Sequence, residues 1–342
     1  MSTVPETAQA IRIEKNGGVE VLEKKTIPLK VSPGEVVIKV DYLGVNFIDT
    51  YHRAGLYKVP LPTSLGKEAA GTIIGLPTDD ETLSNEVYKK RGYKIGGKVA
   101  VDFFGAHADH ISIPWKTVYP VPEAIDTRIA AAALLQALTV VSFIDEAYSV
   151  QKGDTILVHT IAGGLGLIFA QLISARGATV IGTTSTPEKA ELAKKNGAHH
   201  VILYKSENVV ERVLEITNGE GVNAIFDGVG KDTFDNNFKM IRRKGTIVSV
   251  GNASGAVPPF SPLKLIEKNV KLLRPTQANY TYTPEEVDHY NEILWPLISD
   301  GTLKINIFKE YPFTVKGYTQ AQEDLVGGRT TGKVIVDISK TD

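Results

Sequence analysis

From residue 155 onward, short apolar runs alternate with polar stretches of helical character. The pattern predicts strands at 155–159, 178–183, 200–204, 222–228 and 246–251. The stretches PEKAELAKKNG and ENVVERVLEITNG lie between them, and each ends in a glycine suited to a helix C-terminus. A capping box from Ser185 to Glu188, with a proline beside it, is predicted to open the first of these helices. Such alternation predicts a parallel, doubly wound sheet.

The first 120 residues have a different pattern, with β-rich runs separated by glycine and proline. These runs lie at 35–46, 97–103 and 109–114. The polar stretch 78–94 predicts a surface loop or a short exposed helix, and the alanine-rich stretch 124–147 predicts a buried or boundary helix. The tail, 301–342, returns to mixed β character. We therefore expect a β-rich module split around an α/β module.

Composition narrows the class of protein. The chain has 342 residues, no cysteine and a net charge of −1. Disulfides, thiolate nucleophiles and sulfur-ligated zinc are excluded, and no bulk charge attracts nucleic acid or an anionic membrane. The N-terminus lacks the apolar core of a signal peptide, and we find no apolar run of about 18 residues, the length of a membrane helix. We expect a cytoplasmic protein.

The stretch ILVHTIAGGLGLIFAQL, 156–172, is typical of a strand, a glycine-rich turn and the start of a helix. Gly163 and Gly166 occupy the second and last glycine positions of a GxGxxG fingerprint, and Ile161 stands at the first. Amide groups at a helix N-terminus bind a pyrophosphate well. A tight packing turn is the alternative interpretation, but the run of βαβ units favours a dinucleotide site. We expect Ile161 to point into the sheet packing, away from the pyrophosphate.

The end of the second α/β strand indicates which dinucleotide is bound. Thr183, Thr184 and Ser185 stand there, and the first acidic residue is Glu188. A carboxylate at this place binds the ribose hydroxyls of NAD and repels a 2′-phosphate, whereas hydroxyls with Lys189 nearby favour NADPH. The alternative for Lys189 is an ordinary solvated helix lysine.

The β-rich part lacks the ligands of a catalytic zinc, which dehydrogenases with this split layout often carry. Asn46 stands where a cysteine ligand is needed, and Lys67 stands where a histidine is needed. His107 and His110 lack an evident third ligand, so we interpret them as structural or exposed residues. We expect no metal.

Without a metal, hydride can pass directly to an electron-poor acceptor held by a planar platform and hydrogen-bond donors. Asn46, Tyr51 and Tyr57 lie in one segment and are the candidate catalytic residues. The alternative is a pair of half-buried tyrosines and a turn asparagine with no role in catalysis.

Several motifs in order carry a resemblance to a known family. They are GVNFIDTYHRAGLY, GKEAAG, AGGLGL, GNASGAVPPF and LLRPT. Together they resemble the quinone oxidoreductase (zeta-crystallin) family of zinc-free medium-chain dehydrogenases/reductases. The resemblance implies a Rossmann-type doubly wound sheet at 129–269, inserted into a β-rich GroES-like domain at 1–128 and 270–342.

The resemblance also implies metal-free, NADPH-dependent reduction of quinones or activated enones, with hydride transfer in the cleft between the domains. It assigns the pyrophosphate, the 2′-phosphate and the nicotinamide to residues along the chain. The implied cofactor-binding residues are Asn46, Tyr51, Thr139, Ser142, Gly163, Gly164, Leu165, Gly166, Thr184, Ser185, Lys189, Tyr204, Val229, Gly251, Asn252, Ala253 and Arg329. Tyr57 flanks the substrate in this scheme.

The resemblance further suggests a homodimer in which strands near NVKLLRP continue the sheet between subunits. The chain departs from the family pattern at Thr160, Ile161, Ala137, His107 and Gly228. Two alternatives to quinone reduction stay open. One is an NADPH-dependent alkenal or enone double-bond reductase, and the other is a crystallin-like or RNA-associating protein that binds NADPH with incidental turnover. A near-neutral charge without a basic–aromatic stripe argues against RNA as the main partner.

Overall fold

A computed structural model describes residues 4–341, and the chain divides into two compact units. The β-rich unit is formed by Met1–Leu135, Thr281–Ser299 and Ile307–Asp342. The α/β unit is formed by Gln136–Tyr280 and Asp300–Asn306.

The α/β unit is built on a six-stranded parallel sheet with the order β11-β10-β9-β12-β13-β14. The strands are β9 (Thr155–Val158), β10 (Thr179–Thr184), β11 (His200–Leu203), β12 (Val222–Asp227), β13 (Ile241–Ser249) and β14 (Lys271–Leu273). Strand order reverses between β9 and β12, so this is the doubly wound arrangement that the sequence predicts. The carboxyl ends of β9, β10 and β12 therefore meet at one edge, where ligands of such sheets bind.

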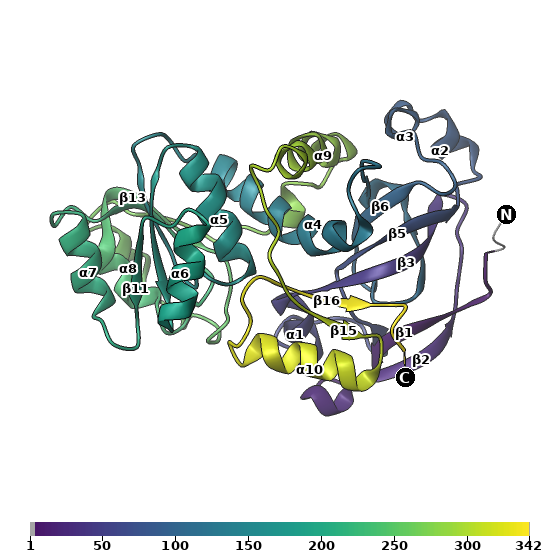
Figure 1. Ribbon diagram of the computed structural model, residues 1–342, viewed down its shortest axis with the longest axis horizontal. Helices are drawn as coiled ribbons and strands as arrows, with labels where there is room; N and C mark the ends of the chain where they lie inside the picture. The colour runs from purple at the N-terminus through teal and green to yellow at the C-terminus, as the bar shows by residue number, and fades with distance from the viewer. Residues whose placement is uncertain (1–3, 342) are drawn as a thin grey trace. The chain divides into compact units, whose positions relative to one another are not determined.

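Helices cover both faces of this sheet. They are α5 (Gly164–Ala175), α6 (Pro187–Lys195), α7 (Val209–Ile216) and α8 (Phe234–Met240). In Figure 1, α5 and α6 lie on one side of the strands and α7 and α8 on the other. The predicted capping box of α6 is wrong by one residue, because the Thr186 side chain, not Ser185, accepts from the amide of Lys189. Pro187 follows as the first helical residue.

The β-rich unit contains two sheets. One has the order β15-β16-β3-β5-β6-β8 with β7 paired to β3, and the other has the order β2-β1-β4. The strands are β1 (Thr7–Ile13), β2 (Glu23–Pro28), β3 (Glu35–Val45), β4 (Thr63–Ser64), β5 (Glu68–Gly75), β6 (Lys98–Asp102), β7 (His110–Pro114), β8 (Val118–Pro120), β15 (Ile307–Pro312) and β16 (Lys333–Asp337). Their apolar side chains, among them Ile38, Leu43 and Ile73, form one core cluster.

Several helices accompany these strands. They are α1 (Phe47–Ala54), α2 (Asp80–Ser84), α3 (Glu86–Arg91), α9 (Pro284–Ser299) and α10 (Val315–Val326). The sequence-based interpretation of 301–342 as mixed β is incomplete, because α10 occupies much of this tail and packs on β15 and β16.

The alanine-rich stretch forms α4 (Thr127–Ser142), followed by a π-helical turn, Phe143–Ala147. The expectation of no membrane-length apolar segment needs correction. Residues Thr127–Ala147 form a helix long and apolar enough to cross a membrane, although 67% of its most apolar window is buried inside the protein. That degree of burial is typical of a core helix.

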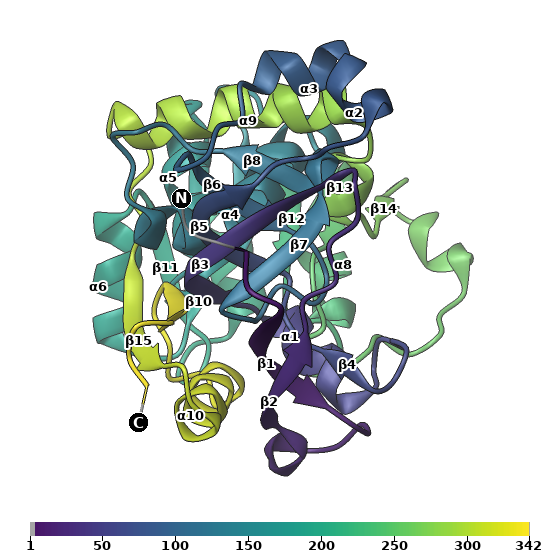
Figure 2. The ribbon, with the colours of Figure 1, turned by 90° about the vertical axis from the view of Figure 1, so that its right-hand side faces the viewer.

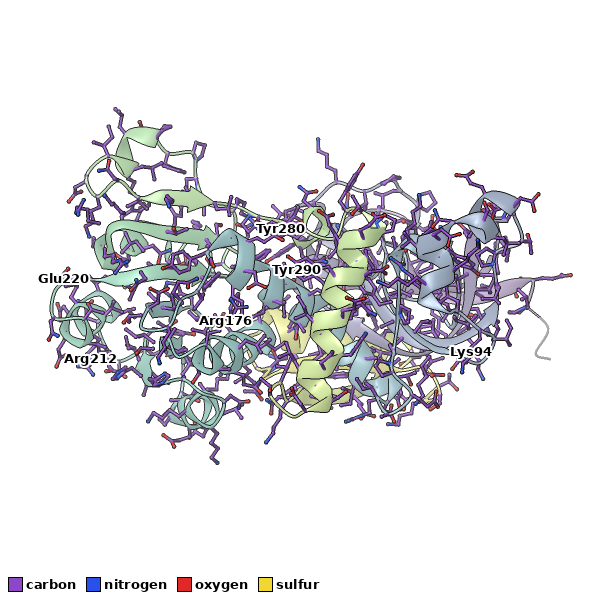
Figure 3. The ribbon with its side chains drawn as sticks, turned by 90° about the horizontal axis from the view of Figure 1, so that it is seen from above. Lys94, Arg176, Arg212, Glu220, Tyr280 and Tyr290 are labelled. Atoms are coloured by element: carbon purple, nitrogen blue, oxygen red, sulfur yellow. The ribbon has the colours of Figure 1, made fainter. Side chains whose placement is uncertain are left out.

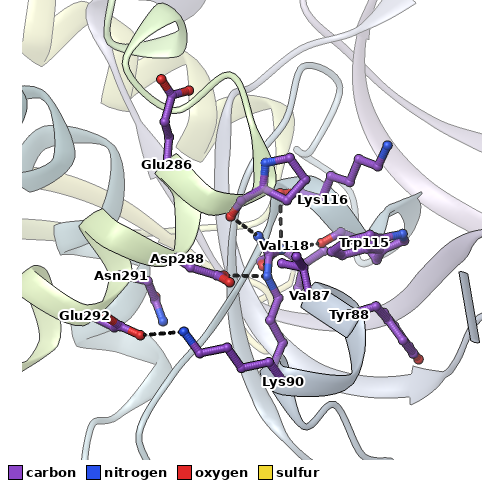
Figure 4. Close-up of polar contacts among 12 residues, drawn as sticks. Val87, Tyr88, Lys90, Trp115, Lys116, Val118, Glu286, Asp288, Asn291 and Glu292 are labelled. Atoms are coloured by element: carbon purple, nitrogen blue, oxygen red, sulfur yellow. Dashed lines mark hydrogen bonds and ion pairs between the residues drawn. The ribbon is translucent and has the colours of Figure 1, made fainter. Parts of the chain in front are cut away.

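The segment 78–94 forms α2 and α3, and it is anchored rather than loose. Figure 2 shows both helices beside α9, and Figure 4 shows Lys90 paired with Glu292. The nearly buried guanidinium of Arg91 donates to Asp288 at 2.7 Å and to the carbonyl of Pro284 at 3.0 Å. Because Arg91 presents donors in several directions, one side chain ties α3 to α9.

Candidate active site

The glycine-rich turn after β9 has the geometry of a phosphate cradle. Gly163 is the N-cap of α5, and the first bond into the helix runs from the Leu167 amide to the Gly163 carbonyl at 2.9 Å. The turns of α5 therefore do not use the amides of 164–166, which point along the helix axis with its positive end. A Cβ at Gly166 would lie 2.4 Å from the Thr160 oxygen, so only glycine fits there.

Ile161 is fully buried, as expected from the sequence. Its amide donates to the Thr183 carbonyl at 3.0 Å, which fixes the loop against β10. A Cβ added to Gly182 would lie 2.5 Å from the Ile161 Cβ, so the branched side chain occupies space left by that glycine. The departure from glycine at position 161 is thus compatible with the cradle.

A buried hydrogen-bond chain supports the loops at the carboxyl edge of the sheet. His159 contacts Thr183 Oγ1 at 3.1 Å and Asn237 Oδ1 at 2.9 Å through its two ring nitrogens. Asn237 Nδ2 in turn donates to Asp227 Oδ2 at 2.6 Å. The other oxygen of Asp227 accepts from the amide of Val229 at 2.8 Å. Such a fully connected network holds the ends of β9, β10 and β12 in one arrangement.

The residues expected around a 2′-phosphate gather where β10 and β11 end. Thr184 closes β10 and is buried, and the Tyr204 amide donates to its carbonyl at 3.1 Å. The Tyr204 ring is exposed. Partial burial lowers the pKa of Lys189, and the positive charge of Lys205 lowers it further. Two lysines therefore stand near the end of β10, where Thr184 and Ser185 replace a carboxylate, which suits a phosphate more than a bare ribose.

Two turns expected on the nicotinamide side are hydrogen-bonded to each other. The amide of Ala253 donates to the Gly228 carbonyl at 3.1 Å, and the amide of Ser254 donates to the Val229 carbonyl at 2.9 Å. Gly251 lies so close that a Cβ there would be 2.9 Å from the Gly228 oxygen. Val229 and the turn containing Gly251, Asn252 and Ala253 thus lie together beyond β12 and β13.

The remaining residues expected near the cofactor are differently placed. Ser142 is fully buried, and its hydroxyl donates to the Leu138 carbonyl one turn earlier at 2.7 Å. Thr139 lies on the same helix and is half-buried. Arg329 belongs to the β-rich unit, where its Nε donates to Asp324 Oδ1 at 2.7 Å. The Ser142 hydroxyl is therefore committed to the helix backbone, and the Arg329 guanidinium carries a carboxylate partner.

In the β-rich unit, the amide of Asn46 belongs to a buried charged network. Its Nδ2 donates to the Gly44 carbonyl at 3.1 Å and to Glu68 Oε2 at 2.8 Å, while its Oδ1 accepts from Lys333 Nζ at 2.7 Å. Lys333 and Glu68 are both fully buried, with 2.5 Å between Nζ and Oε2. The second Glu68 oxygen accepts from the Leu135 amide at 2.7 Å. Each donor of the Asn46 amide has a protein acceptor, so the side chain is held rigidly.

Asn46 is also the N-cap of α1, the helix that carries Tyr51, and Tyr57 follows shortly after the helix ends. Asp49 Oδ2 accepts a hydrogen bond from the backbone N–H of Asn46 at 2.8 Å. Gly55 ends the helix with a φ of 82°. Asp49 is fully buried, and burial raises its pKa to about 7. This carboxyl therefore titrates near neutral pH although it caps a helix.

Aromatic rings cluster around the C-terminal part of α1. The Tyr51 and Tyr57 rings meet edge-to-face with centroids 5.1 Å apart, and Phe47 lies 6.3 Å from Tyr51. His52 packs edge-on against Phe104 at 4.9 Å and lies 6.3 Å from Tyr57. We call these five residues the aromatic cluster. It offers the planar, partly polar surface that the sequence predicts for an acceptor site.

The donor set does not fit a zinc ion. At the two positions where ligands are needed, Asn46 is taken up by the network above and Lys67 forms an ion pair with Asp102 at 2.6 Å. His107 is a core residue: its Nε2 lies 3.2 Å from the Gly44 carbonyl, which can only accept, so its Nδ1 accepts from Tyr318 OH at 2.7 Å. Burial lowers its pKa to about 3, which keeps it neutral. Within residues 4–341 no group of three or more His, Cys, Asp or Glu is placed to hold a metal.

Sequence reasoning missed several supporting residues. Glu68 and Lys333 pair across 265 positions of the chain, and no local pattern connects them. His159 and Asp227 were inside the predicted strands, but their partners come from other elements. Their only sequence signal is position, since a polar residue ending a buried parallel strand stands at the ligand edge of the sheet.

Comparison with known proteins identifies the class and then the family. Residues 32–123 match the description "Alcohol dehydrogenase GroES-like domain" and residues 164–292 match "Zinc-binding dehydrogenase". These two parts, with the fold above, define a medium-chain dehydrogenase/reductase. The chain belongs to the quinone oxidoreductase family. It is 39% identical over 330 residues to a probable quinone oxidoreductase of Schizosaccharomyces pombe, covering 95% of this chain and 96% of the relative.

Two further relatives bear on chemistry. The structure of Escherichia coli quinone oxidoreductase complexed with NADPH matches with a TM-score of 0.89 and 34% identity, over 97% of this chain and 100% of that one. A 2-haloacrylate reductase of Burkholderia is 30% identical, covering 95% of this chain and 97% of the relative. The zinc named in one matched description has no fitting ligands within residues 4–341.

Proposed function

We propose that this protein is a metal-free NADPH:quinone oxidoreductase. The observation that carries the proposal is the end of β10, where hydroxyl groups and the lysines 189 and 205 stand in place of a carboxylate. The glycine cradle before α5 and the NADPH complex of the E. coli relative support the same dinucleotide. The names of four bacterial and fungal relatives, at 35–39% identity, support a quinone as acceptor.

NADPH, when bound, supplies the hydride. In our proposal the amides of 164–166 hold the pyrophosphate, and Ser185, Lys189 and Tyr204 hold the 2′-phosphate. Val229 and the turn Gly251–Ala253 border the nicotinamide. Tyr51 and Tyr57 orient the acceptor on the aromatic cluster. Because both N–H groups and the oxygen of its side-chain amide already have hydrogen-bond partners in the protein, Asn46 acts as a positioning residue that keeps α1 in place.

The cofactor assignment is tested by titrating the protein with NADPH and NADH. Replacing Lys189 or Lys205 with Ala removes a charged partner of a phosphate, an interaction of about 1.5–3 kcal/mol, so NADPH should bind roughly 10- to 100-fold more weakly. NADH affinity should stay unchanged. Lys194→Ala on the same helix is the matched control, because Lys194 is exposed and pairs with Glu191. Equal effects on both cofactors would remove the 2′-phosphate role.

The second candidate function is reduction of an activated carbon–carbon double bond. The similarity to a 2-haloacrylate reductase favours it, because that relative spans the same length as this chain. A panel of quinones, enals and haloacrylates, followed by NADPH oxidation, separates the two. Quinone turnover with a kcat/KM at least tenfold above that of every enone supports our proposal, and the reverse order supports the alternative.

We further propose that the protein is a cytoplasmic homodimer. β14 is the edge strand of the α/β sheet, and its neighbourhood exposes Leu263, Ile266 and Leu273. An exposed apolar edge strand is a surface that proteins usually cover. Sedimentation of the purified protein tests this assembly, and a monomer at micromolar concentration contradicts it.

A further inference from the structure

Lys67 is a largely buried lysine with unused hydrogen-bonding capacity. It precedes β5 directly and its side chain is 18% exposed. Its Nζ lies 2.6 Å from Oδ1 of Asp102, whose side chain is 5% exposed. That ion pair is the one polar contact of the ammonium within residues 4–341. Since an ammonium has three donors, it can bind a further oxygen atom.

His52 contributes a second unused polar group. The residue is 8% exposed, and its buried Nδ1 has no hydrogen-bond partner in the described part of the chain. Burial first, and the positive charge of Lys67 second, lower its pKa to about 4. The ring is therefore neutral near pH 7 and lies close enough to Lys67 to feel its charge. A buried nitrogen without a partner costs about 1–3 kcal/mol, which a ligand atom would offset.

Aromatic rings pack around His52. The His52 ring contacts Phe104 edge-on at 4.9 Å and lies 6.3 Å from Tyr57, which packs on Tyr51. The occupant that fits such surroundings is flat and apolar, with an oxygen atom that becomes negative. A phosphate fits poorly, because the Asp102 carboxylate stands beside the ammonium and aromatic rings pack around His52.

We propose that Lys67 and His52 bind the carbonyl oxygen of the acceptor, and that the Lys67 ammonium protonates it after hydride transfer. The inference rests on the proposed function and goes beyond it by naming the proton donor. Nδ1–H of His52 donates to the oxygen. Hydride addition reduces the quinone by two electrons and leaves a hydroquinone monoanion. An N–H bond of Lys67 then breaks and an O–H bond forms, giving neutral hydroquinone and a neutral amine. Solvent returns a proton to the amine, and Asp102 stabilises the restored ammonium.

The test compares Lys67→Met, Lys67→Arg and His52→Phe, with Lys94→Met as the control. Lys94 is an exposed lysine of the same unit, marked in Figure 3. For p-benzoquinone, Lys67→Met should lower kcat/KM about 100-fold, the usual worth of a general acid. Lys67→Arg keeps the charge but holds its proton, so kcat should fall while the KM stays within about threefold. His52→Phe should raise the KM for p-benzoquinone about two- to tenfold, because one hydrogen bond to its oxygen is lost. NADPH affinity should match that of Lys94→Met in all three variants. Lys67→Met alone should also lower the melting temperature, because it leaves the Asp102 carboxylate without its ion-pair partner.

A second measurement uses p-nitrophenolate, a stable phenolate, as a probe in place of the reduced acceptor. Wild type and Lys67→Arg should bind it, and Lys67→Met should bind it at least about tenfold more weakly. Equal kcat/KM for Lys67→Met and Lys94→Met overturns the proposal, as does a loss confined to NADPH affinity. If wild type turns over no acceptor, the proposed function fails and proton delivery fails with it. Phenolate binding that depends on Lys67 would then still support the oxygen site alone, and its absence would overturn that as well.

Discussion

The buried Glu68–Lys333 pair predicts a large loss of stability when one partner is removed. Both side chains are fully buried, and Lys333 donates to Glu68 and Asn46 together. In Lys333→Met the Glu68 carboxylate stays in the core with only the Asn46 amide and the Leu135 backbone as donors. Leaving such a charge unpaired costs about 3–5 kcal/mol. For a domain of this size about 2–4 °C is lost per kcal/mol, so the melting temperature of the β-rich unit should fall by roughly 6–20 °C.

Calorimetry and urea unfolding measure this loss of stability. Two further variants serve as controls. Lys340→Met removes an exposed lysine that pairs with Glu310, and it should cost less than about 1 kcal/mol. Glu68→Gln combined with Lys333→Met removes both charges, and the glutamine oxygen still accepts from one of the two remaining donors, the Asn46 side chain or the Leu135 backbone. The double variant should regain at least about 2 kcal/mol over Lys333→Met. A single variant that loses less than about 1 kcal/mol, or a double variant no better than the single one, refutes the reasoning.

Three further outcomes follow from the site. Gly166→Ala places a Cβ 2.4 Å from a backbone oxygen, so the loop must shift and NADPH titration should show affinity falling about tenfold or more; unchanged affinity would contradict the cradle. Asp49 binds its proton more tightly when folded, so its raised pKa adds stability at low pH that is lost as pH rises through about 7. Asp49→Asn should therefore gain on wild type in urea unfolding as pH rises from about 4 to about 7 and should keep that gain above pH 7, and a constant difference across this range speaks against a buried ionisation. Tyr57→Phe keeps the ring packing and should change the acceptor KM about two- to tenfold, whereas unchanged kinetics across several quinones would remove the hydroxyl from the site.

The sequence was sufficient for the fold wherever a local pattern repeats. Strand–helix alternation from residue 155 predicted the parallel sheet, because parallel strands buried on both faces are apolar runs of fixed length. It did not predict α10, whose residues 315–326 are polar on much of their surface and owe their place to β15 and β16. The cap of α6 was one residue off because Ser185 and Thr186 are both good caps, and only the backbone decides between them. The domain limits at 129 and 269 stay a prediction.

The sequence predicted those residues of the candidate site that lie together in one continuous segment, but not their partners from distant segments. The glycine cradle lies in one continuous segment, and so do Tyr51 of α1 and the nearby Tyr57, so their motifs could be recognised in the sequence. The partners that fix them come from distant segments: Lys333 reaches Asn46 from the far end of the chain, and Asn237 reaches His159 from another helix. The sequence showed that Lys67 stands where a histidine zinc ligand would be needed. Its pairing with Asp102 was not predicted, because it depends on the register of β5 and β6. Contacts of this kind are set by tertiary packing, which a single sequence does not encode locally.

The Ile161 side chain occupies the space beside Gly182, so substitutions at these two positions, 21 residues apart in the chain, are coupled. The side chain of the first fills the space that any side chain on the second would need, since a Cβ on Gly182 would lie within 2.6 Å of three Ile161 carbons. Whether a substitution at one of these two positions is tolerated therefore depends on the residue at the other. A smaller residue at 161 would leave room for alanine at 182, so an engineered exchange should be made at both positions at once. The cradle then tolerates variation in its sequence while the shape presented to the dinucleotide stays constant.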